Sequence, residues 1–115
     1  MALNDLERKR IENTVGAFVE KLRPPRHIRS QLDFGFCITG QSVELFKVHP
    51  QWNKPEVKHM HSFAKAKFVR TQNKWNIYWK RADLKWHGYE PVPDVATVEE
   101  FLAVVKKDEY ACFFG

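Results

Sequence analysis

The segment from His61 to Glu90 combines the two kinds of residue that a surface for single-stranded nucleic acid needs. Its seven Lys and Arg residues and two acidic residues give it a net charge of +5, equal to that of the whole chain. Its aromatic residues are Phe63, Phe68, Trp75, Tyr78, Trp79, Trp86 and Tyr89. Because cations bind phosphates and rings stack on bases, the segment predicts binding to nucleic acid or, through charge alone, to an acidic protein surface.

Two expected strands, residues 62–70 and 75–81, sort these side chains onto two faces. A turn of either two or four residues keeps the same side chains together on each face of this hairpin. The apolar face then carries Ala64, Ala66, Phe68, Trp75, Ile77 and Trp79. The opposite face carries Lys65, Lys67, Tyr78 and Lys80, which are our candidate binding residues. The alternative is a lysine face that is solvated and binds nothing.

A pair of histidines raises the question of a metal site. His59 and His61 lie two residues apart, so in an extended segment they point the same way. The side chains that could complete a tetrahedral site with them are His49, His87, Cys37 and Cys112. No Cys-x-x-Cys or His-Glu-x-x-His spacing is present, so ordinary surface histidines are the favoured interpretation and we predict no cofactor.

A third candidate is an enzyme that uses Asp83 and Lys85. The acid-x-Lys form is found in one nuclease superfamily, where the carboxylate holds a metal ion and the lysine stabilises charge. The Pro-Asp element expected earlier in such a chain is missing, since Pro93-Asp94 comes afterwards. Asp83 is otherwise a turn residue. We therefore favour a noncatalytic binding function, with a metal-dependent or nuclease-like enzyme as the alternative.

The C-terminal residues Cys112, Phe113 and Phe114 form a short apolar tail. Exposed to water, these side chains would be unfavourable, so they either dock on their own domain or bury against a second subunit in a homodimer. Cys37 and Cys112 are the only cysteines, too few for a disulfide framework, and we expect both to be reduced.

Two helices frame the predicted sheet. Asn4 with Glu7 forms a capping box that begins the first helix, and Pro24 ends it. Its apolar positions, spaced for one helix face, are Ile11, Val15, Phe18, Val19 and Leu22. A second capping box, Thr97 with Glu100, begins a helix whose Phe101, Leu102 and Val105 face inward.

The strands between the helices alternate apolar and polar residues. We expect strands over 32–39, 43–49, 62–70, 75–81 and 85–89, with a loop over 50–58, where Pro, Asn and charged residues show no period. Strands grouped between helices predict an α+β fold: an antiparallel meander of about five strands with both helices packed on one face. Residues 1–115 should form a single domain.

Composition supports a cytoplasmic protein. Hydrophobic residues make up 43% and charged residues 29% of the chain, as is usual in globular proteins. No apolar stretch approaches the roughly 20 residues that cross a bilayer, and residues 1–10 lack the apolar core of a secretory signal. We expect no membrane association.

One run resembles the signature of a known family. It extends from Trp75 to Tyr89 and reads Trp-Asn-Ile-Tyr-Trp-Lys-Arg-Ala-Asp-Leu-Lys-Trp-His-Gly-Tyr. Pro50 with Trp52, the elements Ala64-Lys65 and Lys67-Phe68, and the closing residues 112–115 also look like this family, the bacterial domain-of-unknown-function family numbered 3024. The resemblance implies a compact bacterial domain of this length and supplies no activity, substrate or site.

Overall fold

The chain folds as a six-stranded antiparallel sheet with a helix at each end of the sequence. The computed structural model describes residues 3–108 and residue 113. The elements are α1 (Asp5–Leu22), β1 (Asp33–Thr39), β2 (Ser42–Gln51), β3 (Lys54–Val69), β4 (Lys74–Lys80), β5 (Trp86–Gly88), β6 (Asp94–Val95) and α2 (Val98–Lys107). The strand order is β1-β2-β3-β4-β5, and β6 pairs with β4. The predicted α+β meander is confirmed, with β6 as an unpredicted addition.

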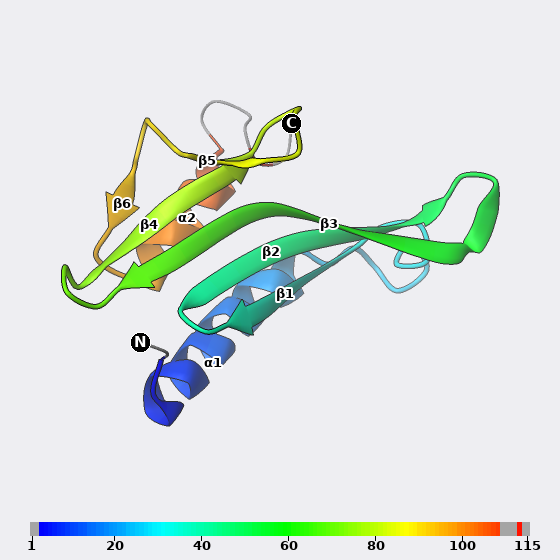
Figure 1. The fold of residues 1–115 in the computed structure, drawn as a ribbon. Helices are drawn as coiled ribbons and strands as arrows, with labels where there is room; N and C mark the ends of the chain where they lie inside the picture. Colours follow the sequence, from blue (N-terminus) through cyan, green and yellow to red (C-terminus); the bar gives the residue numbers. More distant parts are fainter. Residues whose placement is uncertain (1–2, 109–112, 114–115) are drawn as a thin grey trace.

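Both helices cover the same face of the sheet, as Figure 1 shows, where α1 and α2 lie behind the strands. One core joins that face to the helices, and it includes Val15 of α1, Ile77 of β4 and Phe101 of α2, each at most 1% exposed. We call the opposite side of the sheet, turned away from the helices, the outer face. Neither helix among the described residues is long and apolar enough to span a membrane.

The predicted helix starts are confirmed by their hydrogen bonds. The Asn4 side chain accepts from the Glu7 backbone at 2.8 Å, and the Glu7 carboxylate accepts from the Asn4 backbone at 3.0 Å. At the second helix, the Thr97 hydroxyl oxygen accepts from the Glu100 backbone at 3.2 Å. These caps satisfy amide groups that have no partner within the helix and so fix where each helix begins.

The loop predicted over residues 50–58 is wrong. β2 and β3 remain paired there, with His49 opposite His59 and Pro50 opposite Lys58, and a two-residue turn at Trp52 and Asn53 joins them. Residues 53–61 are exposed, so no side is buried and the sequence shows no period-two pattern. We call residues 47–61 the β2–β3 arm; it projects from the body of the domain in Figure 1.

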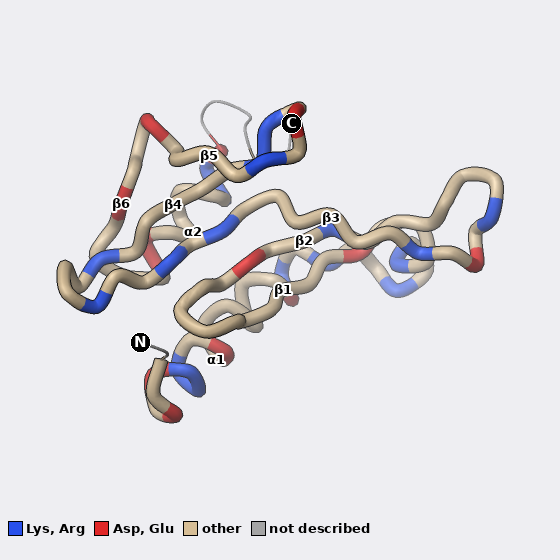
Figure 2. The backbone as a smooth tube through the Cα atoms, viewed as in Figure 1, with Lys and Arg blue, Asp and Glu red and all other residues tan. Residues whose placement is uncertain are grey.

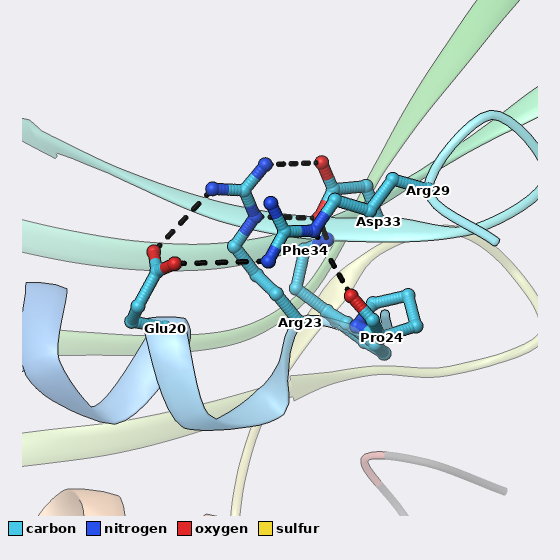
Figure 3. A network of polar contacts seen from close by, with 6 residues as sticks. All are labelled: Glu20, Arg23, Pro24, Arg29, Asp33 and Phe34. Atoms are coloured by element: carbon cyan, nitrogen blue, oxygen red, sulfur yellow. Dashed lines mark hydrogen bonds and ion pairs between the residues drawn. The ribbon is translucent and has the colours of Figure 1, made fainter. Parts of the chain in front are cut away.

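A polar network ties the end of α1 to the start of β1 (Figure 3). Arg23 donates two hydrogen bonds to Asp33, at 2.8 and 3.0 Å, and a longer one to Glu20 at 3.4 Å. Arg29 donates to the Pro24 carbonyl at 2.9 Å. The network closes the connector between helix and strand, so it holds α1 against the face of the sheet opposite to the outer face.

We expect Asp33→Asn to lower the melting temperature at neutral pH. The hydrogen bonds from Arg23 hold the pKa of Asp33 below its ordinary value of about 3.9. A carboxyl whose pKa is lowered by folding stabilises the fold above that ordinary value, and this contribution is lost as the pH falls through the folded pKa. Melting curves of variant and wild type should therefore converge as the pH falls below about 4.

Glu56→Gln, which removes a carboxylate from the exposed arm, is the matched control for Asp33→Asn. A difference between Asp33→Asn and wild type that stayed constant down to pH 2 would contradict the assigned ion pair.

Candidate nucleic-acid interface

The pairing of β3 with β4 confirms the predicted separation of the two faces. Phe68 lies opposite Trp75 and Ala66 opposite Ile77, on the buried side. The turn has four residues, 70–73, so it is one of the two even lengths that the sequence allowed. The tryptophans at 75 and 79 therefore belong to the helix-covered side, where Trp75 is 5% exposed.

The four candidate residues all lie on the outer face. Lys65 is opposite Tyr78 in the β3–β4 ladder, and Lys67 is opposite Asn76. Lys80 follows Tyr78 by two residues on β4 and so points to the same side. Figure 2 shows the basic positions along β3 and β4.

Trp86 of β5 is a fifth member of this surface that sequence reasoning missed. It lies opposite Lys80 in the β4–β5 ladder. The Lys80 ammonium is 5.0 Å from the centre of the Trp86 ring, and the Lys65 ammonium is 5.6 Å from it. The Lys65 ammonium is also 5.8 Å from the Tyr78 ring centre. We call Lys65, Lys67, Tyr78, Lys80 and Trp86 the lysine–aromatic cluster.

The charge of the lysine–aromatic cluster is largely uncompensated. Among residues 3–108 and 113, no ion pair involves Lys65, Lys67 or Lys80. Glu44 of β2 lies opposite Lys65 on the same side of the sheet, without a salt bridge to it. Cation–π contacts of this kind contribute roughly 0.5–1 kcal/mol at exposed sites, so they orient the lysines without neutralising them.

His49, His59 and His61 lie on the β2–β3 arm. His49 and His61 stack with ring centres 4.9 Å apart, and His59 lies 6.0 Å from His49. Partial loss of contact with water lowers the pKa of His61. The nearby side chains of His49, His59, Lys47 and Lys80 lower this pKa further by charge repulsion. Within the described part of the chain, no three His, Cys, Asp or Glu side chains are placed to hold a metal ion.

Of the side chains proposed to complete a metal site, His49 lies beside His59 and His61, whereas His87 and Cys37 lie on other strands. His87 contacts Asp83 at 2.9 Å, far along the chain on β5. Cys37 is an exposed free thiol on β1, and Cys112 lies outside the described residues.

Asp83 has the bonds of a turn residue. Its carboxylate accepts from the Lys85 backbone at 2.9 Å as well as contacting His87. These two hydrogen bonds, the backbone one first, lower the pKa of Asp83. Leu84 between the predicted pair has a φ of 63°, which belongs to a tight turn. Lys85 thus contacts Asp83 through its own backbone N–H and not through its ammonium group. The hydrogen bonds of Asp83 are those of a residue that stabilises a turn.

Phe113 of the C-terminal tail docks on its own domain. It is 4% exposed, and its ring centre is 4.9 Å from that of Tyr89. Its backbone N–H donates to the Asp108 carboxylate at 3.0 Å. Cys112 and Phe114, the other predicted tail residues, lie outside the described residues.

Comparison with known proteins places the chain in a family without adding a function. No curated protein and no solved structure matches it. A family model described as a domain of unknown function, DUF3024, matches residues 3–115, so the resemblance seen in the sequence is confirmed. The chain is a member of the DUF3024 family.

Proposed function

We propose that this protein is a noncatalytic binding domain for single-stranded nucleic acid and that the lysine–aromatic cluster is its contact surface. The observation that carries the proposal is the position of Lys65 and Lys80 over the rings of Tyr78 and Trp86, with Lys67 on the same face of the sheet, which neither helix covers. Among residues 3–108 and 113, these three lysines form no ion pair.

Each part of the cluster suits one part of a nucleic-acid strand. The ammonium groups of Lys65, Lys67 and Lys80 attract phosphates, and binding releases the counterions of the strand. The rings of Tyr78 and Trp86 offer surfaces on which bases stack, with little preference for sequence because every base has a flat face. We therefore expect binding that is sensitive to salt and tolerant of sequence.

An acidic protein surface is the other partner that this charge would attract. It would use the lysines and not the rings, since carboxylates gain little from stacking. Dependence of binding on Tyr78 and Trp86 thus distinguishes the two partners. We further propose a bacterial protein, as the family resemblance implies, and a cytosolic one, because the free thiol of Cys37 suits a reducing compartment.

Fluorescence anisotropy with a labelled oligothymidine of about 15 nucleotides, from about 50 to 200 mM salt, tests the proposal. Lys65→Ala with Lys67→Ala should weaken binding at low salt. It should also reduce the slope of log affinity against log salt by about 1.4, because each phosphate contact to a single strand contributes about 0.7.

Lys9→Ala with Lys21→Ala is the matched control, because it removes the same charge from exposed positions of α1. Equal loss of affinity in both double variants, or no binding by the wild type, would contradict the proposed surface.

A further inference from the structure

The β2–β3 arm is a two-stranded ribbon that extends beyond the body of the domain. Its two strands continue from the sheet after a register shift between Leu45 and Phe46 and end at the turn of Trp52 and Asn53. Its outer half extends past the helices and the other strands in Figure 1, and the longest axis of the structure is 47 Å.

The tip of the arm presents a large ring to solvent. Trp52 is 92% exposed, although burying an indole is among the larger gains that a fold can make. The turn that carries it is braced, because the Gln51 side-chain amide donates to the side-chain oxygen Oδ1 of Asn53 at 2.6 Å. The arm is also anchored, because Lys58 donates to the Ser30 carbonyl at 2.6 Å. Trp52 is thus held away from the core on a fixed support.

The positive charge of the arm favours a negatively charged partner. Residues 47–61 contain three lysines, Lys47, Lys54 and Lys58, and one acidic residue, Glu56. An exposed indole in a basic surrounding complements a base next to its phosphate better than it complements an apolar protein groove.

We infer that the β2–β3 arm is a second contact for nucleic acid, in which Trp52 stacks on a base and Lys54 contacts a neighbouring phosphate. The inference rests on the proposed function, because the same nucleic-acid strand would run from the lysine–aromatic cluster to the arm. β3 connects the two contacts directly: Lys65 belongs to the cluster, and Lys54 begins the strand at the tip.

The distance between the lysine–aromatic cluster and the tip of the arm sets the length of nucleic-acid strand that can contact both. From Lys54 to Lys65, at about 3.3 Å per residue, β3 spans at most roughly 36 Å. A stacked strand rises about 3.4 Å per nucleotide, so about ten nucleotides are needed to bridge this distance. A short oligonucleotide can therefore occupy the cluster alone, whereas a longer one reaches Trp52.

The test compares wild type and Trp52→Ala on oligothymidines of about 5 and about 15 nucleotides by fluorescence anisotropy. We expect Trp52→Ala to weaken binding of the longer oligonucleotide about 5- to 100-fold and to leave the shorter one unchanged. Trp52→Phe keeps a ring and should restore most of the affinity. Because Trp52 is 92% exposed, its replacement should not unfold the domain, which circular dichroism checks.

The outcomes separate the arm from the cluster. Equal affinity of Trp52→Ala and wild type for both lengths would overturn the arm contact and leave the proposed function standing. Failure of the wild type to bind either length would overturn both. If Trp52→Ala instead changed the molecular mass in light scattering without affecting the longer oligonucleotide, the arm would be an interface between copies of the chain and the inference would be wrong.

Discussion

Replacing both Tyr78 and Trp86 by alanine is expected to weaken binding of a 15-nucleotide single strand at least about 30-fold. Stacking of a base on an aromatic side chain contributes roughly 1–3 kcal/mol, so two lost contacts amount to at least about 2 kcal/mol. Both rings lie on the outer face, where the Lys65 ammonium is 5.8 Å from one ring centre and 5.6 Å from the other. Fluorescence anisotropy at constant salt measures the change.

The control for this experiment keeps the rings and changes their identity. Tyr78→Phe with Trp86→Phe preserves two stacking surfaces and should retain most of the affinity. Damage to the sheet would instead lower the melting temperature of both double variants, which thermal melting measures. Unchanged binding by the alanine variant in a folded protein would favour the acidic protein partner, since attraction by charge alone does not need the rings.

Phe101→Ala is expected to reduce the free energy of unfolding by about 3–5 kcal/mol, the usual cost of removing a fully buried phenylalanine. Phe101 is 0% exposed on α2 and belongs to the core that joins the helices to the sheet. Since domains of this size are stable by only about 5–15 kcal/mol, the variant should lose a large part of its stability. Urea denaturation followed by circular dichroism gives the difference.

Val104→Ala provides the comparison on the same helix, because Val104 is only partly buried against the core. It should cost about 1 kcal/mol. At a temperature where both variants are folded, each should bind the oligonucleotide like wild type, because α2 lies on the side of the sheet opposite to the outer face. A similar, small loss of stability in both variants would show that Phe101 does not anchor the helix.

Local patterns were sufficient to predict the helices and the central hairpin. The capping box at Asn4, the N-cap hydrogen bond of Thr97 and the alternation from Ala64 to Trp79 correspond to bonds and faces that the structure contains. In each case the signal lies within a few residues and one side of the element is buried. The placement of Lys65, Lys67, Tyr78 and Lys80 on one face followed from that alternation.

The arm and the role of Trp86 required the tertiary structure. Residues 53–61 are exposed, so burial imposes no period on the arm, and the backbone pairing that holds its strands leaves no alternating pattern in the side chains. Trp86 joins the cluster because β5 pairs with β4 in a particular register, and a strand of three residues carries too little pattern to fix that register from sequence. β6, two residues long, was missed for the same reason.

The most direct test of the proposed surface is a two-dimensional NMR titration of isotope-labelled protein with an oligothymidine of about 15 nucleotides. We expect the largest shifts of amide signals at Lys65, Lys67, Tyr78, Lys80 and Trp86, with little change along α1 and α2. Shifts confined to the helices, or a spectrum unchanged by excess oligonucleotide at low salt, would contradict binding by the outer face.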